Sequence, residues 1–165
     1  MIKLKNLEEI ELMRNSGALV ARVLRLVGER LTPGMTTSEI DKLVEENILA
    51  AGAKPAFKGY RGFPASACVS IDDEVVHGIP GSRKLQNGDI VSVDVGVILD
   101  GWYGDSAATF PVGEISDEKS VLLEVTRAAL ESGIAKVKNG VRLGEVSSAI
   151  QAYAESRGFS IVRDL

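Results

Sequence analysis

The feature that most constrains the fold is a pair of β-rich segments joined by an Asp-Gly dipeptide. Residues 90–99 and 102–112 are rich in β-branched, aromatic and small apolar side chains, and Asp100-Gly101 separates them. A two-residue type I′ turn needs positive φ at both central positions, which Asp and Gly tolerate better than most residues. The sequence therefore predicts an antiparallel hairpin with its tip at residues 100–101.

The turn also fixes the register of the hairpin. It places Gly96 opposite Asp105 and Asp94 opposite Ala107. Because side chains alternate between the two faces of a strand, Asp94 and Asp105 share one face as diagonal neighbours, with backbones roughly 7–8 Å apart. We expect Gly96 to leave an empty volume in which an ion can sit. The opposite face of the first strand is apolar and predicted to join the core, through Val91, Val93, Val95 and Val97.

Two interpretations of the aspartates remain open at this point. Two carboxylates among apolar residues are costly to bury unless they are paired or bound to metal, and cross-strand like charges repel. Their side chains can converge on one divalent ion, or on two ions about 3.5–4 Å apart. The alternative is that both are solvated on a wet sheet face. The metal interpretation is favoured, because Asp is disfavoured inside strands and perturbed acids mark functional sites.

His77 is the only histidine of the chain. We predict a short strand at Glu74–Val76, so that His77 lies where the strand passes into a loop. An imidazole there can hydrogen-bond a substrate or move a proton near neutral pH, and a surface loop histidine is an equally good interpretation. Cys68, between Ala67 and Val69, is by default a small core residue.

Helical periodicity and capping signals predict four helices around this β-rich block. A further short strand is predicted at Ala67–Ser70. The helices are predicted from Asn6 to Thr32-Pro33-Gly34, from Thr36 to Gly52, from Ser116 to Asn139-Gly140, and from about Leu143 to Gly158.

The helices also suggest an internal repeat. The segment Gly34–Ile40 resembles Gly140–Val146, and Gly52 and Gly158 end the two helices at the same offset. Any two amphipathic helices share some pattern, but here the start, the end and the apolar positions coincide. The repeat predicts two related parts, residues 1–112 and 113–165, of which the second contains two helices and the start of a strand at Phe159–Val162.

Composition limits the class of protein. A chain of 165 residues has room for one compact domain, and a net charge of −4 without a basic stripe gives no nucleic-acid footprint. The single cysteine excludes an intramolecular disulfide and favours the reducing cytoplasm. No signal peptide or membrane span is predicted, because the longest apolar stretch, Leu19–Val27, is interrupted by Arg22 and Arg25.

Three segments carry a resemblance to a known family. Cys68–Pro80 contains the run Val75-Val76-His77-Gly78-Ile79-Pro80, Asn87–Gly96 leads into Asp100–Ser106, and the chain ends in Gly158–Leu165. Together they resemble the type I methionine aminopeptidases of peptidase family M24, over essentially the whole chain. Two departures occur: Asp72 stands where the family more often has Asn, and Phe63 stands where Tyr is frequent.

The resemblance implies an α/β (α+β) pita-bread fold, also called the creatinase/aminopeptidase fold, with its first half complete and its second half truncated. It implies a metalloexopeptidase, a methionyl aminopeptidase that removes the initiator methionine before a small second residue. It also implies two divalent ions (Co, Mn, Fe or Zn). Asp94 and Asp105 would be metal ligands, Asp105 bridging both ions, and His77 a catalytic residue that contacts substrate. Residues of the methionine side-chain pocket would be Tyr60, Phe63 and Cys68.

The same resemblance places one His and two Glu ligands beyond Leu165, so we expect residues 1–165 to form an incomplete domain with low or no activity. The expected partners are the N-terminal Met peptides of nascent proteins, with ribosome association, and the full-length protein is expected to be a cytoplasmic monomer. Two alternatives stay open: an Xaa-Pro aminopeptidase relative, or a non-catalytic peptide-binding module on the same fold.

Overall fold

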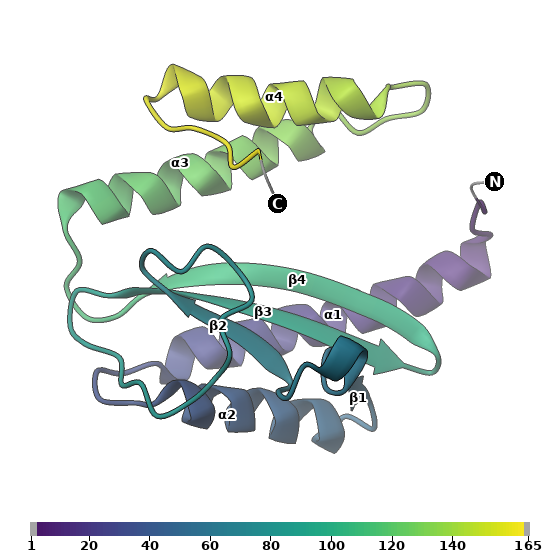
Figure 1. Cartoon of the computed structure of the whole chain (residues 1–165). Coiled ribbons are helices and arrows are strands. Elements are labelled where there is room, and N and C mark those ends of the chain that lie inside the picture. The colour runs from purple at the N-terminus through teal and green to yellow at the C-terminus, as the bar shows by residue number, and fades with distance from the viewer. Residues whose placement is uncertain (1–2, 164–165) are drawn as a thin grey trace. The chain divides into compact units, whose positions relative to one another are not determined.

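The computed structural model describes residues 3–163 and divides into two compact units, with the boundary between Ile115 and Ser116. Met1, Ile2 and the last two residues of the predicted Gly158–Leu165 motif lie outside the described residues. The elements, labelled in Figure 1, are α1 (Leu7–Arg30), α2 (Thr37–Ala50), β1 (Lys54–Pro55), the 3₁₀ turn η1 (Tyr60–Gly62), β2 (Ala67–Ile71), β3 (Ile90–Leu99), β4 (Trp102–Pro111), α3 (Asp117–Ile134) and α4 (Leu143–Ser156).

The first unit is a four-stranded antiparallel sheet covered on one face by α1 and α2 (Figure 1). The central strand is β3, which pairs with β4 along one edge and with β1 and β2 along the other. The apolar stripes of the two helices and the valines of β3 together form the core, as their period predicts. The opposite sheet face carries the polar residues described below.

The predicted hairpin is confirmed residue by residue. Asp100 and Gly101 have φ values of 52° and 82°, both positive as a type I′ turn requires. Leu99 pairs with Trp102, Gly96 with Asp105, and Asp94 with Ala107. The four alternate valines of β3 are completely buried, which confirms the apolar face.

A close backbone approach holds α1 against β4. A Cβ placed on Gly104 would lie 2.6 Å from the carbonyl carbon and oxygen of Ser16 and 2.9 Å from the amide nitrogen of Gly17. The completely buried Ser16 hydroxyl donates to the carbonyl oxygen of Trp102 at 3.0 Å. Position 104 therefore has no room for a side chain. The contact fixes the position of the β4 backbone immediately before Asp105.

The predicted helix starts are confirmed. Capping boxes pair Asn6 with Glu9 and Thr36 with Glu39, and the Ser116 side chain accepts a hydrogen bond at the start of α3. The predicted end of α3 at Asn139-Gly140 is wrong, because the helix stops at Ile134. After Gly133, which is a poor helix former, the backbone hydrogen bonds join residues three apart, as in a 3₁₀ turn, and no longer four apart.

The second unit, α3 and α4, repeats the geometry of the α2 region at the offset seen in the sequence. The helices α2 and α4 contain the same number of residues, and the Glu145 carboxylate accepts the amide of Arg142 at the start of α4 as Glu39 accepts that of Thr36 at α2. Of these two helices only α2 has a complete capping box, because the Arg142 side chain has no acceptor. Gly52 and Gly158, each two residues past its helix, have φ values of 73° and 83°. These matches support the repeat, whose interpretation as two related halves stays a prediction.

Two predicted strands are wrong. Residues Glu74–Val76 lie in a long loop between β2 and β3, because the chain turns at Asp72–Asp73 and the Glu74 carboxylate accepts the amide of Ile71 at 2.8 Å. Residues Phe159–Val162 are also not a strand, since no other segment among residues 3–163 forms a ladder with them. No helix within the described part of the chain is both long and apolar enough to cross a membrane.

Candidate metal centre

Asp94 and Asp105 lie on the sheet face opposite the core, as the register predicts. Cys68 of β2 stands directly opposite Asp94 of β3, so the three side chains occupy neighbouring positions on three adjacent strands. Asp94 is half-buried, Asp105 is exposed and Cys68 is buried. The sheet therefore brings two carboxylates and a thiol together without any contribution from the second unit.

The electrostatics of this face disfavour a second negative charge. Burial raises the pKa of Asp94 above its ordinary value, and the neighbouring Asp105 carboxylate raises it further. The nearby His77 and the backbone amide of Val95 oppose this rise. A divalent cation between the two carboxylates would remove their repulsion, so the donor chemistry of the pair fits such an ion.

Cys68 responds to the same environment. Burial, and then the charges of Asp94 and Asp105, raise the pKa of the Cys68 thiol to about 11. The thiol is therefore protonated near neutral pH, and Cys68 behaves as an apolar wall beside the carboxylates and not as a thiolate ligand.

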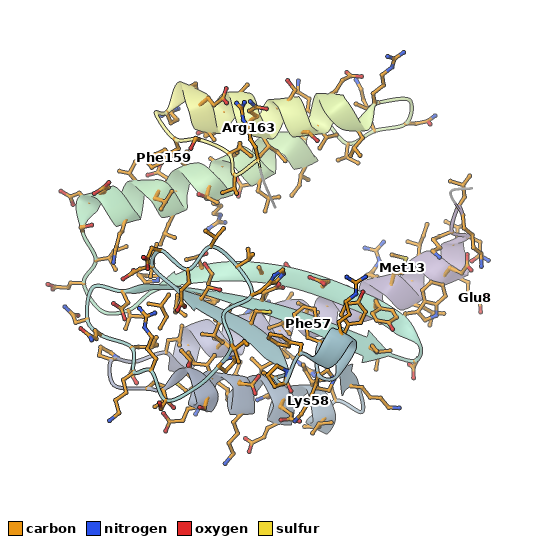
Figure 2. All side chains as sticks on the ribbon, viewed as in Figure 1. Glu8, Met13, Phe57, Lys58, Phe159 and Arg163 are labelled. Atoms are coloured by element: carbon orange, nitrogen blue, oxygen red, sulfur yellow. The ribbon has the colours of Figure 1, made fainter. Side chains whose placement is uncertain are left out.

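The expectation that Gly96 leaves an empty volume for an ion is wrong. A Cβ on Gly96 would lie 2.5 Å from Cε1 of the Phe57 ring and 3.0 Å from the Cβ of Ala56. The ring of Phe57, labelled in Figure 2, occupies this volume, and the amide of Ala56 donates to the Gly96 carbonyl oxygen at 2.9 Å. Gly96 thus admits an aromatic ring beside Asp105, and any ion must lie elsewhere on this face.

His77 lies in the loop between β2 and β3 and not at the end of a strand, as the loss of the predicted 74–76 strand requires. It is exposed, and its φ of 60° is in the left-handed region. The imidazole is near enough to Asp94 to lower the pKa of that carboxyl. The loop therefore brings His77 to the face that carries the two aspartates, although it approaches from outside the sheet.

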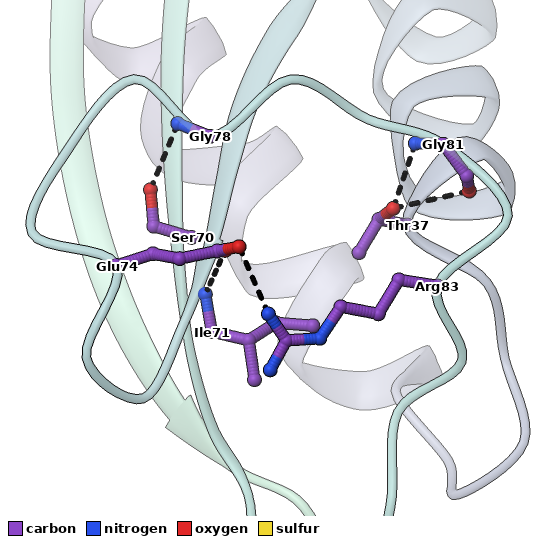
Figure 3. Close-up of polar contacts among 7 residues, drawn as sticks. All are labelled: Thr37, Ser70, Ile71, Glu74, Gly78, Gly81 and Arg83. Carbon is purple, nitrogen blue, oxygen red and sulfur yellow. Dashed lines mark hydrogen bonds and ion pairs between the residues drawn. The ribbon is translucent and has the colours of Figure 1, made fainter.

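The loop that carries His77 is tied to the sheet and to α2 at three places (Figure 3). Glu74 accepts from Ile71 and binds Arg83 at 2.8 Å, and the amide of Gly78 donates to the Ser70 hydroxyl at 3.1 Å. Gly81 donates its amide to the Thr37 hydroxyl at 2.8 Å. These hydrogen bonds consequently fix the path of the loop and the position of His77 on the surface.

Tyr60 and Phe63 lie together in the tight turn around η1. Phe63 donates its amide to the carbonyl oxygen of Tyr60, and Tyr60 donates its own to the carbonyl oxygen of Phe57, each at 2.9 Å. Tyr60 is 64% exposed, whereas Phe63 is half-buried. Their connection to the aspartates runs through Phe57, whose ring covers Gly96. Sequence reasoning missed Phe57 as part of this face, although glycine opposite a carboxylate in a strand is itself a signal of close approach.

The two aspartates are not a complete metal site. Among residues 3–163, no group of three or more His, Cys, Asp or Glu side chains has a geometry that could hold a metal ion. Sequence reasoning also missed Ser70, which is on the same sheet face but contributes through the loop and not as a ligand.

These features define a mixed α/β protein with a pair of sheet carboxylates, beside a histidine, as a candidate metal centre. The chain belongs to metallopeptidase family M24, whose sequence profile matches residues 11–165.

Named relatives agree with this assignment. Methionine aminopeptidase of Clostridium perfringens (strain 13 / Type A) is 49% identical over 164 residues, which are 99% of this chain and 66% of that protein. Methionine aminopeptidase 1 of Bacillus subtilis (strain 168) is 48% identical with the same coverage. A crystal structure of methionine aminopeptidase from Rickettsia prowazekii matches with a TM-score of 0.98 and 42% identity, over 99% of this chain and 66% of that one. The predicted pita-bread fold is therefore confirmed for the part of it that this chain spans, about two thirds of these relatives.

Proposed function

We propose that this chain is part of a methionine aminopeptidase, a hydrolase that removes the N-terminal methionine of nascent proteins before a small second residue. The observation that carries the proposal is the convergence of Asp94 and Asp105 on one sheet face, beside His77. The similarity to enzymes named methionine aminopeptidase supports the substrate.

Asp94 and Asp105 are proposed as the ligands that this part of the chain would supply to two divalent ions. When bound, such ions would supply Lewis acidity for the hydrolysis of the peptide bond. Carboxylate donors accept Co, Mn, Fe or Zn, and the donors present do not discriminate among these. The remaining ligands, one His and two Glu, are proposed to lie beyond Leu165, as the family resemblance implies.

His77 and the apolar residues are proposed to hold the substrate. The imidazole, held over the carboxylate face by its loop, is placed to donate a hydrogen bond to the scissile carbonyl and to the charge that develops on it. Cys68, Tyr60 and Phe63 are proposed to line the pocket for the methionine side chain, for which a protonated, buried thiol is a suitable wall. The ring of Phe57 would close this pocket above Gly96.

Several consequences concern the protein as a whole. Residues 1–112 and 113–165 are proposed as the first half, and the start of the second half, of a pseudo-symmetric domain. With two of its ligands, residues 1–165 should release methionine slowly or not at all. The full-length protein is proposed to be a cytoplasmic monomer that meets its substrates as they leave the ribosome.

The metal proposal is tested by titrating the metal-free chain with Mn²⁺ in a calorimeter. Asp94→Asn and Asp105→Asn should each lower the affinity for Mn²⁺ at least about tenfold, because each replaces a charged carboxylate ligand by a neutral amide of similar size. Asp100→Asn is the matched control, since it makes the same chemical change at the tip of the same hairpin and Asn suits a type I′ turn. Equal affinity in all four proteins would refute the assignment of the ligands.

The substrate is tested separately, with a chain extended to the length of the relatives. Release of methionine from a Met-Ala peptide, without cleavage of an Xaa-Pro peptide, is the expected result. Preferred cleavage of the Xaa-Pro peptide would replace the proposal with the Xaa-Pro aminopeptidase alternative, and metal binding without cleavage of either would favour a peptide-binding module. Full-rate methionine release by residues 1–165 alone would contradict the incompleteness of the site.

A further inference from the structure

His77 has a backbone conformation that its own sequence does not favour. Its φ of 60° is in the left-handed region, which costs a non-glycine residue free energy even though His tolerates it better than β-branched residues do. Such a conformation persists only where surrounding contacts determine it. The contacts that hold His77 are therefore part of the site.

The nearest of these contacts is on the next residue, Gly78. Its amide donates to the Ser70 hydroxyl at 3.1 Å, and its carbonyl oxygen accepts from the amide of Val69 at 2.9 Å. A Cβ on Gly78 would lie 2.2 Å from the Val69 carbonyl oxygen, so the two backbones are in direct contact. The loop is clamped onto β2 immediately after His77 (Figure 3).

Ser70 belongs to the same sheet face as the candidate ligands. It lies two residues after Cys68, which is paired with Asp94, and it is itself paired with Ser92. Only 3% of Ser70 is exposed, so its hydroxyl has little access to water. A buried hydroxyl needs a hydrogen-bond partner within the protein, and the Gly78 amide is that partner. One side chain thus connects the carboxylate face to the loop that carries the histidine.

The other anchors of the loop are farther from His77 along the chain. Glu74 and Arg83 join the two ends of the loop, and Thr37 holds Gly81 against α2. They limit the path of the loop, but neither acts on a residue adjacent to His77. At Gly78 the loop is held by the backbone bond from Val69 and by the Ser70 hydroxyl. Ser70 is the side-chain anchor of this pair, and its loss would weaken the hold on the backbone next to the imidazole.

We propose that Ser70 is a positioning residue for His77: its hydroxyl, by accepting the Gly78 amide, holds His77 in its left-handed conformation over the Asp94 and Asp105 face. The importance of this for catalysis rests on the proposed function, in which His77 contacts the substrate. The positioning itself is a property of the metal-free chain.

The experiment is NMR spectroscopy of the metal-free 165-residue chain, in which the single histidine gives one imidazole signal set. Ser70→Ala should speed hydrogen exchange of the Gly78 amide roughly threefold to tenfold, the effect of one net hydrogen bond. It should also change the His77 amide-to-Hα coupling, which reports φ, and shift the imidazole signals. Ser92→Ala is the matched control, because it removes a hydroxyl from the same face that is bonded to Thr109 at 2.8 Å and not to the loop.

A second pair of variants separates the hydroxyl from packing. Ser70→Thr and Ser70→Val differ only by a hydroxyl against a methyl, so Thr should restore the wild-type signals of His77 and Val should not, even if Ser70→Ala folds poorly. Wild-type exchange and His77 signals in Ser70→Val, or equal changes in Ser92→Ala, would overturn the proposal. Because no metal or peptide is present, this result is independent of the titration that tests the proposed function.

Discussion

Two glycines at the contact between α1 and β4 should respond in opposite directions to the same substitution. Gly104→Ala places a methyl group 2.6 Å from the backbone of Ser16, which cannot rotate away as a side chain could. At Gly17, one residue further along α1, an added Cβ meets nothing within 4 Å. The pair therefore tests whether the backbone approach, and not glycine content as such, holds the helix on the strand.

The magnitudes follow from the contacts. Overpacking against backbone costs about 1–3 kcal/mol, and a helix that moves away also loses the Ser16–Trp102 hydrogen bond, worth about 1 kcal/mol. Replacing Gly by Ala also stabilises the protein by about 0.5–1 kcal/mol, because it reduces the conformational entropy of the unfolded chain. Gly104→Ala should therefore lower the free energy of unfolding by about 2 kcal/mol. Gly17→Ala should raise it by about 0.5–1 kcal/mol, because alanine is the better helix former.

Urea denaturation followed by tryptophan fluorescence measures both. Trp102 is the only tryptophan and begins β4, so its emission reports the first unit alone. With a urea dependence of roughly 2 kcal/mol per M, the midpoint should fall by about 1 M for Gly104→Ala and rise by about 0.3–0.5 M for Gly17→Ala. A Gly104→Ala midpoint within about 0.2 M of wild type would refute the reasoning, since it would mean that α1 does not limit the space above β4.

Three further outcomes concern the site and its support. Asp94→Asn should raise the free energy of unfolding of the metal-free chain near neutral pH by about 0.2–1 kcal/mol, the range for a like-charge cross-strand pair. The gain should vanish in acid, because the raised pKa of Asp94 means that this carboxyl is then protonated in the folded state. Burial raises the pKa of Cys68 from about 9 to about 11, so between these pH values only the thiol of the unfolded chain ionises, and the free energy of unfolding should fall as pH rises. Cys68→Ala should remove that part of the fall. An unchanged dependence of the free energy of unfolding on pH in this variant would contradict the burial argument. Asp41→Ala should lower the free energy of unfolding by about 1–3 kcal/mol in urea titrations, because its carboxylate accepts the amides of Ser66 and Ala67 at 2.8 Å, whereas Asp41→Asn, which keeps an acceptor, should cost less.

The parts of the fold that sequence predicted correctly are those set by contacts between near neighbours. The hairpin register follows from Asp100-Gly101 and the two-residue period, and both are local. The caps at Asn6 and Thr36 are likewise formed by residues three apart. Because these signals are local, the sequence alone is sufficient to place the paired aspartates on one face of the sheet.

The errors at the site arise mainly where distant segments meet. Nothing in the period of β3 indicates that Phe57, far earlier in the chain, fills the space above Gly96. The error at residues 74–76 is instead local: the valines at 75 and 76 favour a strand, but the Glu74 carboxylate accepts the Ile71 amide and the chain turns. Ser70 is an ordinary strand serine in sequence, and its importance depends on a loop that returns to it.

Two costs to stability belong to the candidate site itself: the mutual repulsion of Asp94 and Asp105, and the left-handed backbone of His77. Neither cost is needed for the core, which is complete on the other face of the sheet. The sheet register fixes the aspartates, and the Ser70–Gly78 contact holds the loop next to the histidine. The strain at His77 can therefore be offset within the first unit. The repulsion of the aspartates is offset there only in part, by His77 and the Val95 amide, and a cation would offset the remainder. It follows that metal should stabilise this unit through its carboxylates and leave the His77 clamp unchanged, so that the two halves of the proposed mechanism can be measured apart.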